Sequence, residues 1–246
     1  MINFFEELSL NAWPALQTKL YDGWVLRFAE GYTNRSNSIS PLYHAMLPLD
    51  EKIGNCENEY RKQNLAVTFK LTQDNFLLDQ ELEKRNYTRL NETSVRLLEM
   101  EEYQYRKPSG ILIEDTFSEG WFRDWESFAN LKEPKSQVIA GNILRNITGE
   151  VIVIRKIIDG KTVGCGFGVK ERDYIGLYDI IVSQDYRGQG YGRNIIDGIL
   201  SAAFEKKVGH AYLAVVVGNT AAENLYHSIG FQEIYRYWYR QKIRKK

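Results

Sequence analysis

Apolar and polar positions follow their clearest pattern after residue 110. The run ILIEDTF predicts a strand, and apolar residues recur at helical spacing around residues 121–129 and 135–147. The stretch VIVIRKIIDGKTVGCGFGV predicts two strands joined at Asp159-Gly160, a dipeptide that suits the positive φ angles of a tight hairpin. A further apolar strand, YIGLYDIIV, leads into the glycine-rich stretch RGQGYG.

A helix follows these glycines. Its apolar residues fall on one stripe at the 3.6-residue period, and they are Ile195, Ile196, Ile199, Leu200, Ala203 and Phe204. The chain continues with a strand at AYLAVVV and a short helix at TAAENLYHSIG, where Gly230 suits the helix end. An aromatic strand, FQEIYRYWYRQ, follows. The glycine stretch therefore connects a strand to a helix.

A change in composition marks a boundary between two parts of the chain. Residues 101–110, EEYQYRKPSG, collect charge, a proline and a glycine between two apolar runs. We therefore predict an N-terminal domain of residues 1–107 and a C-terminal domain of residues 108–246.

Charge and cysteine content narrow the function. The chain has 246 residues with 32 basic and 32 acidic side chains, so no overall field favours nucleic acid or an anionic membrane. We expect a small-molecule or peptide partner. Its two cysteines lack the spacing of a disulfide framework or a zinc site, so we predict no metal. No basic signal segment or apolar run of about 20 residues is found, and we expect a cytoplasmic protein.

The RGQGYG stretch predicts an anion site. Free N–H groups at a helix N-terminus carry partial positive charge, and glycines let a polyphosphate approach the backbone. Arg187 adds a full positive charge. The stretch is either a site for a pyrophosphate-bearing cofactor or a turn that only joins a strand to a helix. It lacks the Rossmann GxGxxG and the P-loop GK[ST] ending, which leaves coenzyme A.

Two motifs in this region resemble the GNAT superfamily of N-acetyltransferases. Arg187, Gly190 and Gly192 match its acetyl-CoA loop, [RQ]xxGx[GA]. The later stretch VVVGNTAAENLYHSIGF is similar to the strand, Asn-bearing loop and short helix of the superfamily, with matches at Asn219, Ala222, Tyr226, Gly230 and Phe231. The resemblance covers roughly residues 110 to 240. It implies an α/β (α+β) fold with a mixed, mostly antiparallel sheet flanked by helices, here in two tandem halves.

The resemblance also implies an activity and a donor. The expected reaction moves an acetyl group from acetyl-CoA to a primary amine of an unidentified acceptor by direct attack. The alternatives are a sensor module that binds acyl-CoA without catalysis, and a structural protein whose glycine loop binds nothing. The residues expected to bind the cofactor are Ile180, Ile181, Val182, Arg187, Gly188, Gln189, Gly190, Tyr191, Gly192, Arg193 and Asn219.

Two residues are candidates for proton transfer. Tyr226 matches the tyrosine acid of the superfamily, which protonates the coenzyme A thiolate; otherwise it is a core tyrosine. Asp179 lies where many members have a strand glutamate and is a candidate base, or it only orients substrate or faces solvent. The later position where some members carry a catalytic glutamate is Ala214 here, so the identity of the base stays open.

The N-terminal half contains a weak internal repeat of the C-terminal half. LAVTFKLT followed by LLDQELEKRNYTRL repeats the order of LAVVVGNT followed by AENLYHSIGFQEIY, with Leu82 at the place of Tyr226. The acidic Asp50 and Glu51 start its predicted helix and would repel a pyrophosphate. We therefore interpret residues 1–107 as a degenerate GNAT-like domain that shapes the substrate site. The protein is expected to be a monomer or a homodimer.

The segment DGWVLRFAEGYTNRSNS supplies the candidate acceptor-binding residues. These side chains either line the acceptor pocket or only build strands and a turn, and both interpretations stay open. The residues are Trp24, Arg27, Tyr32, Arg35 and Asn37.

Overall fold

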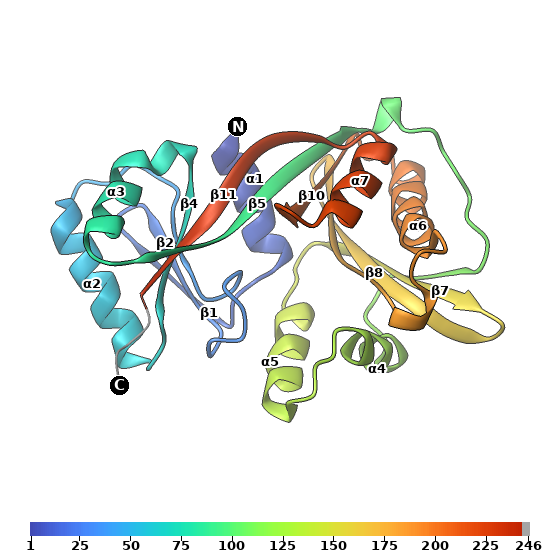
Figure 1. The fold of residues 1–246 in the computed structure, drawn as a ribbon, viewed down its shortest axis with the longest axis horizontal. Helices are drawn as coiled ribbons and strands as arrows, with labels where there is room; N and C mark the ends of the chain where they lie inside the picture. The colour runs from blue at the N-terminus through green and yellow to red at the C-terminus, as the bar shows by residue number, and fades with distance from the viewer. Residues whose placement is uncertain (243–246) are drawn as a thin grey trace. The chain divides into compact units, whose positions relative to one another are not determined.

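The computed structural model describes residues 1–242, and the chain divides into two compact units (Figure 1). One comprises Met1–Ser94 and the C-terminal strand from Tyr235, and the other comprises Val95–Ile234. The sequence predicted a single boundary after residue 107. The chain instead passes between the units twice, within the long strands β5 (Thr88–Glu99) and β11 (Gln232–Lys242). No composition change marks these crossings, because each strand continues unbroken through its boundary.

The first unit packs helices against a sheet with the strand order β1-β2-β3-β4-β11-β5. Its apolar core joins Leu26 and Phe69 of the sheet to Tyr60 and Leu82 of helices α2 and α3, all fully buried. The elements are α1 (Ile2–Ala12), β1 (Gln17–Tyr21), β2 (Trp24–Phe28), β3 (Ile39–Pro41), α2 (Leu49–Lys62), β4 (Val67–Thr72), α3 (Phe76–Lys84) and the adjoining parts of β5 and β11.

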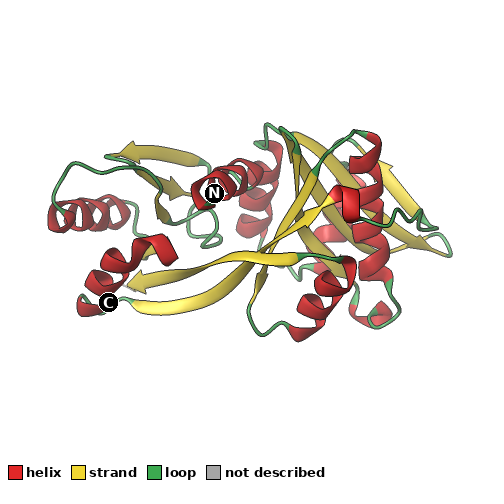
Figure 2. Cartoon of the chain, turned by 90° about the horizontal axis from the view of Figure 1, so that it is seen from above, coloured by secondary structure: helices red, strands yellow, loops and turns green. Residues whose placement is uncertain are grey.

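The second unit has the strand order β11-β5-β10-β9-β8-β7-β6. Strands β6 to β9 pair antiparallel in succession, and β10 pairs parallel with β9. The elements are β6 (Ile111–Glu114), α4 (Glu119–Phe128), α5 (Pro134–Arg145), β7 (Glu150–Ile158), β8 (Lys161–Glu171), β9 (Tyr174–Val182), α6 (Tyr191–Glu205), β10 (His210–Val216), α7 (Thr220–Ile229) and the adjoining parts of β5 and β11. This mixed, mostly antiparallel sheet flanked by helices confirms the predicted fold class (Figure 2).

Strand β8 shows how helices α4 and α6 cover opposite faces of this sheet. A Cβ added at Gly166 would lie 3.0 Å from Ile195 of α6, so this position faces α6. The ring of the next residue, Phe167, lies 5.9 Å from that of Trp121 on α4. Because successive side chains of a strand point to opposite faces, the sheet separates the two helices.

The predicted hairpin and amphipathic helix are both present, with one difference. Asp159 and Gly160 have φ angles of 48° and 76° and join β7 to β8, as predicted. The apolar stripe of α6 is buried as far as Ala203, but Phe204 is 50% exposed and its ring lies 5.8 Å from that of Tyr105. The prediction for Phe204 was wrong, because this position lies about 180° around the helix from Ile195, at the edge of the apolar stripe.

None of the helices within residues 1–242 combines the length and the apolar character needed to cross a membrane.

Candidate functional site

The glycine stretch forms an open loop at the N-terminus of α6. Gly188 and Gly190 have φ angles of 74° and 80°, a backbone region that favours glycine, and Gly190 is the N-cap of α6. A Cβ added at either glycine would have no heavy atom within 4 Å, apart from those of the glycine itself and its two neighbours in the chain. Glycine is therefore required here by backbone conformation, and the exposed loop leaves room for a ligand against its amides.

The electrostatics of this loop suit an anion. The first turn of α6 contains no acidic residue, and its N-cap, Gly190, has no side chain that could accept from the first N–H groups. The first N–H groups of a helix have no partner within the helix, so they are available to an oxyanion. Exposed Arg187 donates from Nε to the Val182 carbonyl oxygen at 3.2 Å, which does not neutralise its charge.

Arg193 has a different environment from Arg187. Its Nε lies 3.1 Å from Oδ1 of Asp197, a carboxylate whose residue is only 2% exposed. Tyr103 donates its hydroxyl to the same oxygen at 3.0 Å. In this structure the Arg193 guanidinium balances a buried charge, and Nη1 also lies 3.4 Å from the Ser228 carbonyl oxygen.

A bulge in β9 determines where Asp179 points. The register of β8 against β9 shifts between Cys165 and Phe167, and Asp179 has a φ angle of 46°. The Tyr178 ring stacks on Phe167 at 5.5 Å, on the α4 face of the sheet. Asp179 reaches the same face, because its Oδ2 accepts a hydrogen bond from Nε1 of Trp125 at 3.2 Å. Two successive side chains of β9 thus lie on one face.

Strands β9 and β10 pair only over part of their length. Their parallel ladder ends at Leu177 and Leu213, although β9 continues to Val182 and β10 continues to Val216. Beyond this point β9 keeps its pairing with β8, through Ile181 and Val182. The ladder therefore opens at the level of Asp179 and the partly exposed Ile180, Ile181 and Val182. The exposed Ala214 directly follows Leu213, the last residue of β10 that pairs with β9.

Tyr226 lies on α7 and packs against the apolar core of the second unit. Its ring contacts that of Phe231 edge-on, with the centroids 6.0 Å apart. Burial, and secondly the negative charge of Asp179, raise the pKa of Tyr226 to about 12. The phenol is therefore protonated at neutral pH, and it lies within electrostatic reach of the carboxylate.

Asn219 is the N-cap of α7. Its Oδ1 accepts a hydrogen bond from the Ala222 N–H at 3.4 Å, and the side chain is exposed. Helix capping is therefore one reason for an asparagine at this position. Its role in binding the cofactor stays a prediction.

The buried members of the predicted acceptor-binding set serve the interior of the first unit. Trp24, Arg27 and Asn37 are 4%, 3% and 5% exposed. Arg27 donates to the Arg35 carbonyl oxygen at 2.6 Å and to the Trp13 carbonyl oxygen. Asn37 accepts from the N–H groups of residues 29 and 31, at 2.7 and 2.9 Å. These contacts support the interpretation that Arg27 and Asn37 build strands and a turn, and Trp24 belongs to the apolar core of the same unit.

The other two members of this set are half-buried. The Arg35 guanidinium lies 3.9 Å from the ring centroid of Trp13, a cation–π contact, and Tyr32 donates its backbone N–H to the Ala29 carbonyl oxygen at 3.0 Å. A role of Tyr32 and Arg35 at an acceptor stays a prediction.

The aromatic residues of α4 were missed by the sequence analysis as part of the site. Trp121 and Trp125 are buried, and their rings stack with centroids 5.7 Å apart and an angle of 12° between planes. Their i, i+4 spacing places both on one helix face, which is a visible signal of helix packing. This spacing does not reveal that the Trp125 indole contacts Asp179, because Asp179 lies 54 positions further along the chain.

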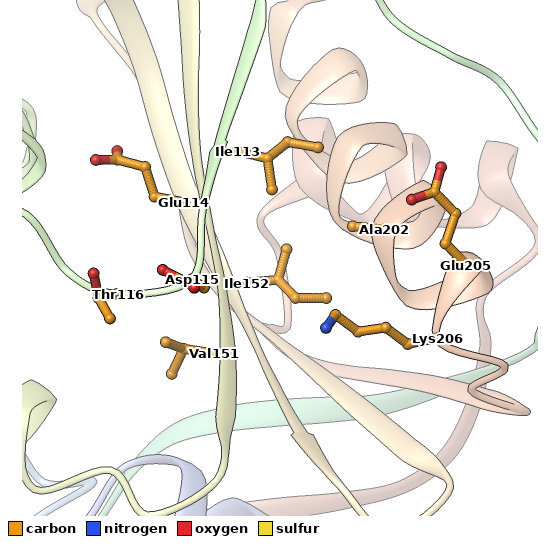
Figure 3. A pocket seen from close by; sticks show the side chains of 9 residues that line it. All are labelled: Ile113, Glu114, Asp115, Thr116, Val151, Ile152, Ala202, Glu205 and Lys206. Atoms are coloured by element: carbon orange, nitrogen blue, oxygen red, sulfur yellow. The ribbon is translucent and has the colours of Figure 1, made fainter.

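A pocket of the second unit lies near the C-terminal end of α6, at the opposite end of this helix from the glycine loop (Figure 3). Helix α6 has 15 residues, so its two ends are about 20 Å apart. The pocket is therefore distinct from the glycine loop. It is lined by Ile113, Glu114, Asp115, Thr116, Val151, Ile152, Ala202, Glu205 and Lys206.

Comparison with known proteins identifies the family. Residues 2–240 match the family described as "Probable histone acetyltransferase Rv0428c C-terminal". The uncharacterized N-acetyltransferase YobR of Bacillus subtilis is 25% identical over 264 residues, which cover 98% of this chain and 98% of YobR. The ribosomal protein bS18-alanine N-acetyltransferase of Escherichia coli is 37% identical over 57 residues, 23% of this chain and 38% of that enzyme.

Solved structures support the fold. The GCN5-related N-acetyltransferase from Kribbella flavida has a TM-score of 0.70 and 12% sequence identity, and the match covers 99% of this chain and 95% of that one. The match at family level spans both compact units, and the expected resemblance is confirmed. The chain belongs to this acetyltransferase family, within the GNAT superfamily of N-acetyltransferases, and is an acyltransferase enzyme.

Proposed function

We propose that this acetyltransferase takes the acetyl group from acetyl-CoA and transfers it to a primary amine by direct attack. One observation carries the proposal: the parallel β9–β10 ladder ends at Leu177 and Leu213, so β9 continues through Asp179 toward the glycine loop without pairing with β10. The same strand, β9, runs into the glycine loop through residues 183–190. The proposed donor site and the candidate base thus belong to one strand and the loop that follows it, and the Asp179 charge contributes to the raised pKa of the candidate acid, Tyr226.

The residues fit the chemical groups of acetyl-CoA. The N–H groups at the start of α6 and the Arg187 guanidinium suit the pyrophosphate, and the loop glycines leave its approach open. The β9 backbone beyond the ladder, at Ile180 to Val182, offers amides for the pantetheine arm and the thioester oxygen. Acetyl-CoA supplies the activated acyl group, and the protein supplies binding, orientation and proton transfer.

Proton transfer gives Asp179 and Tyr226 separate roles. An alkyl amine has a pKa near 10.4, so using it as the ammonium at neutral pH costs roughly 4–5 kcal/mol unless a base accepts the proton. Asp179 accepts that proton, directly or through a water. Tyr226 donates its proton to the departing thiolate, and its raised pKa keeps the phenol protonated beforehand.

The acceptor is an amine in this proposal. The Escherichia coli relative acts, by its name, on an alanine of a ribosomal protein, which supports an amino group as the acceptor class. A cytoplasmic location belongs to the same proposal, because Cys56 and Cys165 are both free thiols. We further propose that the first unit shapes the acceptor site without binding acetyl-CoA, since Leu82, which replaces the tyrosine acid, is fully buried.

The test is thermal unfolding of the purified protein with and without acetyl-CoA, followed by release of free thiol over a panel of amines. A ligand that binds only the folded state raises its stability by about 2.7 kcal/mol at a hundredfold excess over Kd. A thermal shift with thiol release supports the transferase and identifies an acceptor class. A shift without release over the whole panel supports the acyl-CoA sensor, and no shift contradicts the proposed donor site.

A further inference from the structure

We propose that Trp125 of α4 is a positioning residue for the reaction, holding the Asp179 carboxylate toward the acceptor amine. This inference rests on the proposed function, in which Asp179 is the base. The indole Nε1 of Trp125 donates to Oδ2 of Asp179 at 3.2 Å. A carboxylate has two acceptor oxygens with about four lone-pair sites, so one indole N–H orients it without exhausting its capacity to accept a proton.

The Trp125 side chain has little freedom to move. It is 1% exposed, and its ring stacks on that of Trp121, which is 0% exposed. The Trp121 Nε1 donates to the Ile154 carbonyl oxygen of β7 at 3.2 Å. This hydrogen bond fixes Trp121 to the sheet, and the stacked Trp121 ring restricts Trp125. A donor fixed in this way keeps a hydrogen-bonded carboxylate in one orientation.

The backbone at Asp179 explains why such a contact matters. The bulge and the φ angle of 46° direct this side chain to the α4 face, where the regular alternation of a strand would not place it. Left-handed backbone conformations cost energy for residues with a Cβ unless the surroundings maintain them. The hydrogen bond to Trp125 is a contact that maintains this conformation, and it ties α4 to the opened end of the ladder.

The charged and titratable surroundings of Asp179 are compatible with this role. Cys165 on β8 is buried, and burial raises its pKa, so the thiol is neutral. The phenol of Tyr226 on α7 is likewise neutral at pH 7. On α4 itself, Asp124 lies 3.6 Å from the Arg155 guanidinium, which partly balances its charge. The Trp125 indole is itself an uncharged donor. It therefore orients the Asp179 carboxylate without neutralising its charge.

The experiment is a double-mutant cycle with a matched control. Trp125→Phe keeps an aromatic ring at the position and removes the N–H donor. Trp121→Phe removes an equivalent indole donor from the same helix, but one that serves the Ile154 carbonyl group. Each is made alone and with Asp179→Asn, since asparagine tolerates the left-handed backbone. The readouts are kcat, the KM for acetyl-CoA and its Kd.

We expect Trp125→Phe to lower kcat about tenfold, with the acetyl-CoA Kd unchanged, because the lost contact orients the base. In the Asp179→Asn background, Trp125→Phe has no further effect on kcat. Trp121→Phe keeps an aromatic ring against Trp125 and leaves the Trp125 N–H donor in place, so it is expected to lower kcat less than Trp125→Phe does. Additive effects of Trp125→Phe and Asp179→Asn would overturn the inference, and so would full activity of Asp179→Asn.

A second measurement does not depend on activity. In the free protein, the indole ¹H–¹⁵N resonance of Trp125, assigned by its loss in Trp125→Phe, is expected to shift on Asp179→Asn. The Trp121 resonance, assigned in the same way, is expected to shift far less. Equal small shifts of both signals would show that the hydrogen bond is absent in solution, and the inference would fail even if transfer activity is present. Absence of transfer in the wild type, with a shifted Trp125 signal, would instead contradict the proposed function alone.

Discussion

Asp179 and Tyr226 illustrate how neighbouring groups define a single residue's chemistry. Asp179 carries a carboxylate on a bulged strand, and Tyr226 carries a phenol on a helix that packs against the core. Burial and the nearby carboxylate both disfavour the phenolate, so Tyr226 retains its proton until about pH 12. A tyrosine in this state is ready to donate a proton and unsuited to act as a base at neutral pH.

The substitution Tyr226→Phe tests this assignment. We expect it to lower kcat about a hundredfold, because general acids contribute about that much or more, while the acetyl-CoA Kd stays within about twofold. The measurement is steady-state kinetics from pH 6 to 10 with binding followed by calorimetry. Because the pKa of Tyr226 is about 12, no falling limb of kcat/KM below pH 10 is expected from its ionisation in the wild type. Full activity of the variant across this range would show that the acid is another group.

The environment of a second residue, Asp22, predicts how the stability of the folded state depends on pH. Its carboxylate accepts hydrogen bonds from the Met46 and Leu47 N–H groups and lies 3.0 Å from Nζ of the buried Lys52. The two backbone hydrogen bonds lower its pKa to about 2. A carboxyl group with a lowered pKa stabilises the folded state above its unfolded value near 3.9, and this stabilisation is lost as the pH falls toward 2.

We therefore expect Asp22→Asn to reduce thermal stability at pH 7 and to differ progressively less from the wild type between pH 4 and pH 2. Thermal unfolding by circular dichroism over this range measures the difference. A gap between the two proteins that stays constant down to pH 2 would contradict this role of Asp22.

The glycine loop and α6 act together as an element. The strand β9 ends at Val182, and the loop turns through two left-handed glycines so that α6 begins with its N–H groups exposed. The helix is held by the burial of Ile195, Ile196 and Ile199 against the sheet. Its N-terminal N–H groups are therefore held in place, which suits the anion site proposed here.

Gly190→Ala tests the loop, and Gly160→Ala is its matched control. Both glycines have positive φ, 80° and 76°, and open space at the Cβ position, so each substitution costs about 1–2 kcal/mol of backbone strain. We expect similar losses in the free energy of unfolding from urea titration. Only Gly190→Ala is expected to weaken acetyl-CoA binding, since Gly160 lies in the β7–β8 hairpin. Equal acetyl-CoA Kd values for both variants would argue against binding at the loop.

At the scale of the whole molecule, the two units share the strands β5 and β11. The core of the second unit includes Leu98, Met100 and Tyr103, which precede the predicted boundary at residue 107. A fragment that starts at residue 108 therefore lacks part of its own core and one strand of its sheet.

Two fragments distinguish the boundary that composition predicted, at residue 107, from the boundaries that packing gives. We expect residues 95–234 to fold cooperatively and to keep a thermal shift with acetyl-CoA, because they contain the complete second unit. Residues 108–246 are expected to unfold at a lower temperature or to aggregate, since the apolar surface that covered Leu98 and Met100 is exposed. The measurement is circular dichroism melting with and without ligand. A stable, ligand-responsive fragment 108–246 would contradict this division.

Local signals in the sequence determined much of this protein. An apolar run predicted β9 over residues 174–182, an apolar stripe predicted the helix α6 after the glycines, Gly230 marked the end of α7, and Asp159-Gly160 predicted the β7–β8 hairpin. These features depend on backbone preferences and on burial of one face, and both are written in short stretches of chain. The glycine motif and the residues near Tyr226 resembled one superfamily, and the family comparison confirmed that resemblance.

Only the tertiary structure decided how these parts meet. The bulge at Asp179, the end of the β9–β10 ladder and the contact from Trp125 each join segments far apart in the chain. For Arg27 the sequence left a ligand contact and a structural role equally open, and in the structure its guanidinium donates to the carbonyl oxygens of Arg35 and Trp13. Composition describes what a side chain can do, whereas burial and partners decide what it does, and these depend on contacts that no local pattern encodes.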